Sequence, residues 1–353
     1  MTTKEIAHIR FQNQLLADNT RFESPKAIVA WMGAMQAQHF EMSKYAIGAR
    51  LQDATKTLIE TAMDKGEILR THILRPTWHL VAQEDIRWMM ELTGPNINKL
   101  TLSMNRQMQL DEALFKKSAK IIQKCLEGGK AMTRKEIMAE LEKKGISTKS
   151  YSAAMFMFRA ETDMLVCSGP MRKKETTYAL FEERVPASPA ISREEALAKL
   201  ISRYLHSHGP ATVKDFSWWS GLTLTDAKKA LALVQKDFLS AVVDGESYWF
   251  SDNQGALMPN ASTIQLLPAF DEFLVSYKSR DSTIKKEHQA KAFSGKNGYF
   301  QPIIVQNAQV IGTWKPSGTG KNASLSYDFF EKGTKAQEKE MEKAVAHYRE
   351  FAL

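Results

Sequence analysis

The feature that most constrains the fold of this chain is a succession of helix, helix and hairpin that recurs along it. Its clearest copy starts at Met132, where MTRKEIMAELEKKG has a capping box, Thr133 with Glu136, ahead of an amphipathic helix. The stretch SYSAAMFMFRAETDM predicts a second helix. Two β-prone runs, 165–167 and 177–181, then flank a Gly-Pro loop. This order of elements is typical of a winged helix.

The same order is found again from Ala211. The stretches ATVKDFSWWSG and LTLTDAKKALALVQKD predict two helices, and SREEALAKLISRYLHSHG predicts a further helix before them. Strands at 239–243 and 247–250 follow, joined by Asp244-Gly245, which is a strong signal for a two-residue hairpin loop.

The N-terminal region has the same layout. Ser24-Pro25 predicts the start of a helix over 25–36, and a second helix is expected over about 55–65. The following EILRTHILRPTWHLV contains two β-prone runs that predict a hairpin. Because sequence identity between the copies is low, the repeat is one of layout only.

We therefore expect an α+β fold with three tandem winged-helix domains, at 1–95, 105–186 and 190–255. The remaining segment, 260–353, is different. Its stretches ASTIQLLPAFDEFLVSYKSR and GYFQPIIVQNAQVIGTWK are strand-like, and KAQEKEMEKAVAHYREFAL predicts a closing helix. The fourth and last part of the molecule is thus expected to be a β-rich segment and a helix.

The charge of the chain favours a polyanionic partner. The 353 residues carry a net charge of +8, and the isoelectric point is about 9.2, which fits nucleic acid first. The Gly-Pro loop is the expected wing of the second unit and a candidate DNA contact, because it carries Arg172, Lys173 and Lys174. A second basic run has Lys278, Arg280, Lys285, Lys286, Lys291 and Lys296. It either follows a phosphate backbone, with Lys278 and Arg280 as contacts, or is a solvated loop.

Other classes of protein are disfavoured. No apolar run approaches the roughly 20 residues of a membrane span, and the polar start MTTKEIAHIR has no signal-peptide core. Cys125 and Cys167 are the only cysteines, too few for a disulfide framework or a CxxC motif. We expect a cytoplasmic, nucleoid-associated protein that acts as a monomer and needs no membrane.

The stretch MQAQH places two glutamines, Gln36 and Gln38, at the end of an apolar helix. Residues two apart in a helix point about 200° apart and cannot face one ligand. The pair converges only if the helix ends there, and EMSKYAIGAR after it breaks the helical pattern, so we place Gln36, Gln38 and the adjacent His39 in a turn between two helices. The alternative is one glutamine in the core and one on the surface.

The expected hairpin is rich in basic and aromatic side chains. Alternation places Arg70 and His72 on one face of a strand. Together with Arg75 and His79 they are candidate DNA contacts, although His79 is equally suited to a backbone hydrogen bond, and Trp78 is expected in the core.

Three further features are interpreted as structural. His206-x-His208 stands at a helix end, where cations suit the helix dipole, rather than in a metal site. Trp218-Trp219 is expected in the core. Asp271, in the apolar PAFDEF, is expected to pair with an arginine such as Arg280 rather than to line a cleft.

LRPTWHLVAQEDIRWMMELTGP, LLPAFDEFLVSYKSR and NGYFQPIIVQNAQVIGTWK together resemble the winged-helix family that contains the AlkZ and YcaQ DNA glycosylases. The resemblance covers nearly the whole chain. It implies three winged helices in a C-shape with a C-terminal β-rich part, and removal of bulky N7-alkylguanine adducts or unhooking of interstrand cross-links. The family's catalytic signature is Gln, an apolar residue, then Gln, or Asp in the cross-link-unhooking branch. Gln36-Ala37-Gln38 matches the two-glutamine form.

The resemblance implies a monofunctional DNA glycosylase without metal or organic cofactor, acting on duplex DNA with alkylated bases. Neutral amides are no general base, but each offers an acceptor and donors that position a water. This suffices only for a leaving group that is already activated, such as cationic N7-alkylguanine. The alternative is a non-catalytic DNA-binding protein, a regulator or architectural factor, because fold does not fix function.

Overall fold

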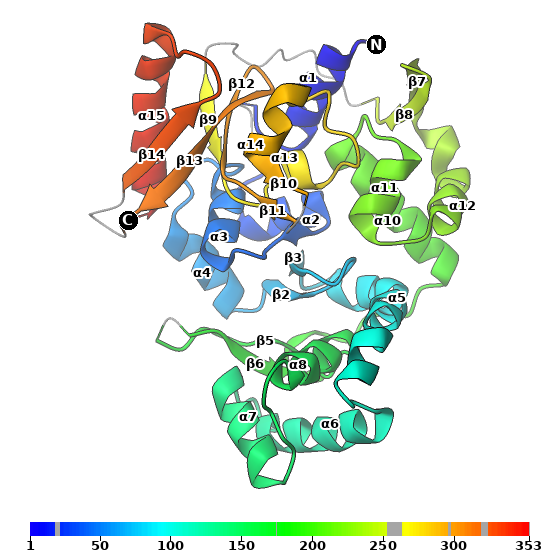
Figure 1. The fold of residues 1–353 in the computed structure, drawn as a ribbon. Coiled ribbons are helices and arrows are strands. Elements are labelled where there is room, and N and C mark those ends of the chain that lie inside the picture. Colours follow the sequence, from blue (N-terminus) through cyan, green and yellow to red (C-terminus); the bar gives the residue numbers. More distant parts are fainter. Residues whose placement is uncertain (18–21, 174, 253–262, 296–297, 319–323, 353) are drawn as a thin grey trace.

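The computed structural model describes residues 1–353 except 18–21, 174, 253–262, 296–297, 319–323 and 353. Helix α1 (Thr3–Asn13) is followed by three units that share one order of elements: helix, short strand or bridge, helix, helix and hairpin (Figure 1). The first unit consists of α2 (Pro25–Met32), β1 (Met35–Gln36), α3 (Phe40–Gly48), α4 (Lys56–Asp64), β2 (Ile68–His72) and β3 (Trp78–Ala82).

The second and third units repeat this order. The second consists of α6 (Glu112–Leu126), β4 (Met132–Thr133), α7 (Arg134–Lys143), α8 (Ser152–Thr162), β5 (Val166–Ser168) and β6 (Thr177–Leu180), followed by α9 (Phe181–Arg184). The third consists of α10 (Arg193–His208), α11 (Val213–Ser220), α12 (Leu224–Val234), β7 (Leu239–Val243) and β8 (Glu246–Phe250).

The strands of the units also pair in the same order. In the first unit the sheet order is β1-β3-β2, and in the second it is β4-β6-β5. The third unit reduces its first strand to one bridge, which joins Ala211 to Trp249 on β8. In each unit a short segment between the first and second helices therefore pairs with the last strand of the hairpin, and the repeat of layout extends to strand pairing.

The C-terminal segment does not form a core of its own. It contains β9 (Ile264–Leu267), α13 (Glu272–Val275), α14 (Gln289–Ala292), β10 (Phe293–Ser294), β11 (Tyr299–Phe300), β12 (Ile303–Gln306), β13 (Gln309–Ser317), β14 (Ser324–Phe329) and α15 (Lys335–Ala352). Strands β14, β13, β12 and β9 form one sheet in that order. Its buried side chains share a single apolar core with those of α1 to α4, so the two ends of the chain are packed together (Figure 1).

Helix α5 (Ile86–Gln107) links the first unit to the second. The stretch between the expected domains, 96–104, is therefore helical rather than a loop, and Pro95 lies within the helix. A second core joins the hairpin of the first unit and α5 to the third unit, while the second unit has a core of its own, below the rest in Figure 1.

Two local expectations for the first unit are wrong. The helix expected over 25–36 ends at Met32, because Gly33 has a φ of 78° and closes it. The stretch EMSKYAIGAR does not break the helix pattern but forms α3. Residues Met42–Gly48 of α3 are all buried, so the helix lacks the polar face by which periodicity is recognised.

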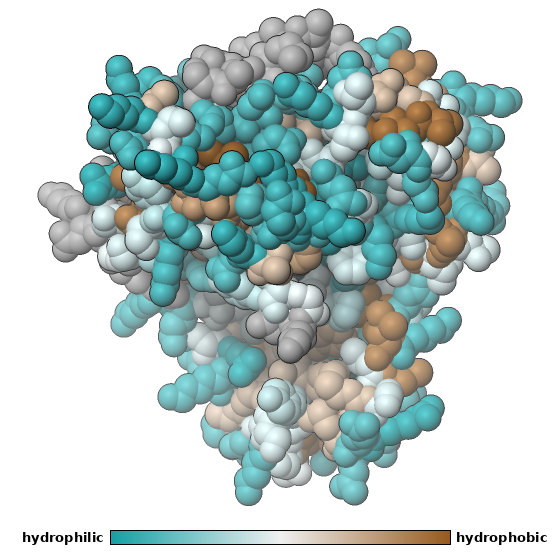
Figure 2. Space-filling model, turned by 45° about the horizontal axis from the view of Figure 1, so that its top comes forward, coloured by the Kyte–Doolittle hydropathy of each residue, from teal (hydrophilic) through white to brown (hydrophobic). Residues whose placement is uncertain are grey.

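In the C-terminal segment, the stretch ASTIQLLPAFDEFLVSYKSR is strand only at β9 and helical at α13. Figure 2 shows a largely hydrophilic face with hydrophobic side chains gathered on the right, over the third unit. Exposed apolar residues there include Leu233, Leu239 and Val242. Among the described residues, no helix combines the length and apolarity needed to cross a membrane.

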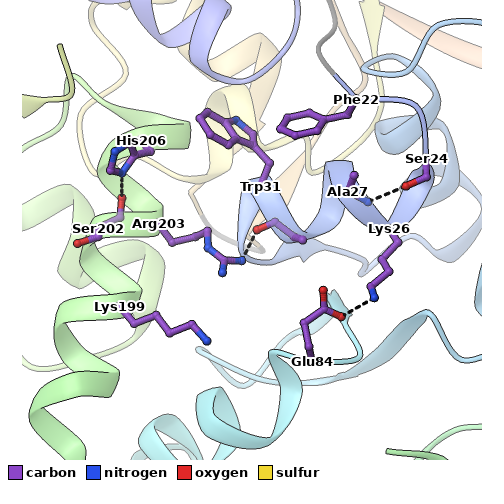
Figure 3. A pocket seen from close by; sticks show the side chains of 11 residues that line it. Phe22, Ser24, Lys26, Ala27, Trp31, Glu84, Lys199, Ser202, Arg203 and His206 are labelled. Atoms are coloured by element: carbon purple, nitrogen blue, oxygen red, sulfur yellow. Dashed lines mark hydrogen bonds and ion pairs between the residues drawn. The ribbon is translucent and has the colours of Figure 1, made fainter. Parts of the chain in front are cut away.

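A cavity of about 610 Å³ lies between α2 and α10 (Figure 3). Its cations are already paired with acids: Lys26 with Glu84, and Arg203 with Asp85. None of its lining residues belongs to residues 36–39, the glutamine segment, which contains Gln36 and Gln38.

Candidate active site

The first unit departs from the other two at the glutamines. In the second unit the second helix begins directly after the paired Thr133, and in the third unit only Thr212 separates the paired Ala211 from the helix; Thr133 and Thr212 form the N-terminal capping boxes. In the first unit Ala37, Gln38 and His39 follow strand β1 before α3 begins. The helix cap is there a weaker contact, in which the Met42 N–H donates to His39 Nδ1 over 3.4 Å. Such breaks of an otherwise consistent pattern mark functional sites.

Two charged side chains hold Gln36, which is 7% exposed. The backbone N–H of Gln36 donates to Glu272 Oε1 at 2.6 Å. Its side-chain Oε1 accepts from Arg75 Nη2 at 2.8 Å. Arginine has donors only, so the carbonyl of the Gln36 amide must face Arg75 and its NH₂ group faces the other way. The orientation of the Gln36 amide is therefore set by the hydrogen bond from Arg75.

Ala37 is fixed by its backbone. Its N–H donates to the carbonyl of Trp78 at 2.7 Å. Its carbonyl accepts from Arg70 Nε at 3.2 Å and Nη2 at 3.0 Å. The Arg70 guanidinium lies 4.0 Å from the centre of the Trp78 ring and 5.0 Å from that of Phe40. Arg70, expected to contact DNA, is thus engaged in holding the glutamine segment.

Gln38 and His39, by contrast, are exposed. The Gln38 side chain makes no hydrogen bond to any residue that the structure describes, so both its carbonyl and its NH₂ group are available to a ligand. The segment therefore combines one clamped glutamine with one free glutamine. The expected turn between two helices is confirmed, although strand β1 begins it, and the alternative of one buried and one exposed glutamine describes their burial.

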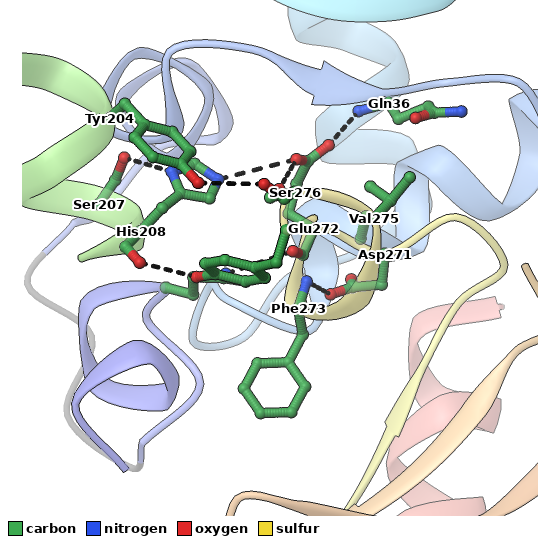
Figure 4. A network of polar contacts seen from close by, with 12 residues as sticks. Gln36, Tyr204, Ser207, His208, Asp271, Glu272, Phe273, Val275 and Ser276 are labelled. Carbon is green, nitrogen blue, oxygen red and sulfur yellow. Dashed lines mark hydrogen bonds and ion pairs between the residues drawn. The ribbon is translucent and has the colours of Figure 1, made fainter. Parts of the chain in front are cut away.

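A buried polar network lies behind Gln36 (Figure 4). Glu272 also accepts a hydrogen bond from the Ser276 hydroxyl, and His208 Nε2 lies 3.7 Å from Glu272 Oε2. Burial opposes the charged form of Glu272, but His208 and Ser276 outweigh it and lower its pKa to about 2. Burial lowers the pKa of His208. Glu272 is therefore an anion that holds the backbone of Gln36 at neutral pH.

His79 pairs with Gln36 in the strand register and is fully buried. Its Nδ1–H donates to the carbonyl of Thr77 at 2.9 Å. Burial, and then the charge of Arg75, lower the pKa of His79 to about 3, so the ring is neutral. Because the ring is fully buried, His79 makes the expected backbone hydrogen bond and is not available as a DNA contact.

His72 lies on the same face of the hairpin as Arg70, as alternation predicts, since both rest on Trp78. Its Nδ1–H donates to Glu161 Oε2 at 3.0 Å. Glu161 also accepts the backbone N–H of His72 at 2.9 Å. These bonds attach the hairpin of the first unit to α8 of the second. Trp78 itself is partly buried.

The other expected DNA contacts lie in two places. Arg172 and Lys173 are exposed in the loop between β5 and β6, where Arg172 forms an ion pair with Glu136 at 2.5 Å, and Lys174 lies outside the described residues, as does Lys296. Lys278 is exposed and Arg280 is half-buried in the loop after α13. Lys285 is paired with Glu331 at 2.6 Å.

The histidines at the end of α10 and the tryptophans of α11 were expected to be structural. His206 and His208 end helix α10 as expected; the His206 Nδ1–H donates to the carbonyl of Ser202, and His208 stacks on Tyr204. Trp219 is fully buried, but the expectation for Trp218 is wrong, because this residue is 37% exposed.

Asp271 has a structural role, but its partner is not Arg280. Its two carboxylate oxygens accept from Arg50 Nη1 and Nη2, each at 2.8 Å. Arg50 lies just after α3, and Arg280 instead donates to the carbonyl of Leu274. No sequence pattern predicts an ion pair between residues that are 221 positions apart.

Glu272 is a site residue that sequence reasoning missed. The available signal was a second acid next to Asp271 in the apolar stretch PAFDEF, since a buried carboxylate needs a partner. The partner, a backbone N–H of Gln36, has no sequence signature.

Known proteins are similar to this chain in sequence and in fold. The family model described as "DNA glycosylase AlkZ-like" matches residues 29–351. An interstrand DNA cross-link repair glycosylase of Streptomyces sahachiroi is 24% identical over 325 residues, covering 87% of this chain and 85% of the relative. The structure of DNA glycosylase AlkZ from Streptomyces sahachiroi superposes with a TM-score of 0.82 at 19% identity, over 100% of this chain and 97% of the other.

The fold of the whole chain is therefore that of AlkZ, and the family match contains Gln36 and Gln38, Glu272 and both arginines that hold the segment. On this match, which spans most of its length, the chain belongs to the AlkZ-like family of DNA glycosylases.

Proposed function

We propose that this protein is a monofunctional DNA glycosylase that hydrolyses the N-glycosidic bond of N7-alkylated purines in duplex DNA, including bulky adducts and interstrand cross-links. The observation that carries the proposal is the glutamine segment, in which Gln36 is clamped and Gln38 is free. The relative from Streptomyces sahachiroi, described as a cross-link repair glycosylase, supports the cross-link part of the proposal.

The two amides make different hydrogen bonds to the attacking water: Gln36 donates and Gln38 accepts. Because the Gln36 carbonyl faces Arg75, the NH₂ group of Gln36 is turned the other way and is the proposed donor to the water oxygen. Gln38 has a free carbonyl to accept a water hydrogen. One donor and one acceptor fix the direction of a water lone pair toward C1′ of the deoxyribose, which is a gain from orientation rather than from proton transfer.

The leaving group completes the chemistry. The bond between C1′ and the purine nitrogen breaks with its electron pair moving to the purine, whose N7 is already positive, so the base departs neutral without a general acid. The water oxygen bonds to C1′, and the released proton passes to solvent. Neutral bases such as uracil lack this activation and are not expected to be substrates.

The units supply the DNA-binding surface. We assign them as three winged helices on the basis of their shared element order and strand pairing. His39, Lys173 and Lys278 are exposed and are proposed to contact DNA, and the net charge of +8 supports a phosphate-dominated affinity. The enzyme is proposed to act as a monomer at the nucleoid.

Single-turnover excision tests the proposal. A labelled duplex with one N7-methylguanine is incubated with excess enzyme, and alkali then cuts the abasic sites. We expect Gln36→Ala and Gln38→Ala each to lower the rate by about 10²-fold, the scale of a lost positioning contact, with unchanged DNA binding. Gln52→Ala is the matched control, because Gln52 is an exposed glutamine of the same unit outside the segment.

Two results contradict the proposal. Excision of uracil at a rate similar to that of N7-methylguanine would exclude the activated leaving group. No excision above the spontaneous rate from either the methylated or a cross-linked duplex would instead identify a non-catalytic DNA-binding protein.

A further inference from the structure

An exposed tryptophan lies beside the glutamine segment. Trp218, on α11, is 37% exposed although its neighbour Trp219 is fully buried. Arg75 connects it to the site, since the guanidinium that holds Gln36 is 6.0 Å from the centre of the Trp218 ring. Two more cations approach the same ring, Lys278 at 4.9 Å and Arg280 at 5.6 Å.

These cations are not held in ion pairs. Among the described residues, none of the three forms an ion pair, whereas the cations of the cavity between α2 and α10 are neutralised. Arg280 donates through Nε to the carbonyl of Leu274, but its buried Nη2 has no hydrogen-bond partner in the described chain, and neither has Arg75 Nε. A buried donor without a partner is costly, and the positive charges of Lys278 and Arg280, which form no ion pair in the described chain, favour an anion at this place.

The ring and the loop are held rigidly. Asp215, on the same helix as Trp218, accepts the backbone N–H of Lys278 at 2.8 Å. The indole Nε1–H of Trp218 donates to the carbonyl of Val275 at 2.9 Å. The position of the indole relative to the loop is thus fixed before any ligand arrives, while the Lys278 ammonium stays mobile on its long side chain.

We propose that Trp218 and Lys278 form a nucleotide-binding subsite next to Gln36, in which a DNA base stacks on the indole and its phosphate binds Lys278 and Arg280. This rests on the proposed function, because it places one nucleotide of the lesion-containing duplex. Aromatic rings bind bases through stacking, and unpaired cations bind phosphates. The lysine that covers the ring in the free protein moves to the phosphate when a base replaces it.

The test uses a duplex with a tetrahydrofuran abasic-site analogue, which binds but cannot be excised. We expect Trp218→Ala to weaken binding about five- to 150-fold, the range for one lost stacking contact, and Trp218→Phe to retain most of the affinity. Lys278→Ala, a change at an exposed side chain, should weaken binding and reduce its salt dependence by about one released counterion. Trp31→Phe is the control, because Trp31 lines the cavity between α2 and α10.

Fluorescence gives a second readout. Stacking should quench an emission component that is present in wild type and absent from Trp218→Phe. Equal affinity of wild type, Trp218→Ala and Lys278→Ala would overturn the subsite. So would a loss in Trp218→Ala that Trp218→Phe shares fully and that follows a fall in melting temperature, because the ring would then act only by holding α11 to the loop.

Different results would overturn the glycosylase activity and the nucleotide-binding subsite. Binding that depends on Trp218 without any excision of alkylated bases would retain the subsite and remove the glycosylase. Excision by the wild type with Trp218-independent binding would retain the glycosylase and remove the subsite.

Discussion

At the scale of single residues, the side chain that decides how Gln36 acts is Arg75. A free glutamine amide rotates between two orientations that exchange its donor and its acceptor. The single hydrogen bond from Arg75 selects one of them. The charge of Arg75 is balanced by Glu272 on the other side of Gln36, so the clamp brings little net charge to the place where positive charge develops on the sugar.

Replacing Arg75 should therefore slow excision without removing either glutamine. We expect Arg75→Met to lower the single-turnover rate on N7-methylguanine by about 10- to 100-fold, since the Gln36 amide loses its fixed orientation. Arg75→Lys keeps the charge and should lie between Arg75→Met and wild type. Arg172→Met is the control for lost positive charge, and it should affect DNA affinity rather than the rate. A rate for Arg75→Met equal to that of wild type would show that the clamp has no catalytic role.

The buried His79 makes a pH-dependent contribution to stability. Its pKa is about 3 in the folded chain and about 6.5 when unfolded, so below pH 6.5 the unfolded state binds a proton that the folded state excludes. The contribution is therefore present above pH 6.5 and is lost as the pH falls. Between pH 6 and pH 4.5 wild type should lose about 2 kcal/mol more than His79→Asn, as measured by urea denaturation at each pH. Parallel curves for the two proteins would contradict a neutral His79.

At the scale of elements, helices and hairpins with clear periodicity were predictable, and the glutamine segment was only partly so. The hairpin of the first unit is recognisable from its alternating β-prone runs, and β2 and β3 confirm it. Strand β1 has two residues, too few to show any period, and residues Met42–Gly48 of α3 are all buried. Both are specified by tertiary contacts, which override local pattern.

Gly221 brings α11 of the third unit against the loop that carries Arg75. It ends α11 with a φ of 69°, and a Cβ atom there would overlap the carbonyl oxygen of Leu74. Gly221→Ala should therefore displace the loop and weaken the clamp on Gln36. We expect a loss of at least about 1 kcal/mol of stability together with slower single-turnover excision.

Gly145→Ala provides the matched control for this change. Gly145 has a φ of 77°, but no atom lies within 4 Å of the position of its Cβ. It carries the same backbone strain without the clash, so it should lower stability and leave excision unchanged. If both variants excise equally well, the approach of α11 to Leu74 does not position Arg75.

At the scale of the whole molecule, the position of the glutamine segment depends on the packing of both chain ends against each other. The repeat of three units is readable from the sequence because each copy is local. The joint core of α1 to α4 with the C-terminal sheet is not, because it is formed by residues more than 200 positions apart. Gln36 is recognisable by the family motif, but its anchor Glu272 comes from this long-range packing.

The Arg50–Asp271 ion pair connects these two ends, and it is buried on both sides. Removing one partner leaves the other charge uncompensated, so Arg50→Met and Asp271→Asn should each cost about 3 to 5 kcal/mol of the free energy of unfolding. Asparagine at 271 still accepts the Phe273 N–H that caps α13, which confines the change to the ion pair. The double variant no longer holds an unpaired charge, so urea denaturation should give a coupling energy of about 1 to 3 kcal/mol. Additive losses would mean that the two ends are held by apolar packing alone, and the position of Glu272 beside Gln36 would then not depend on this ion pair.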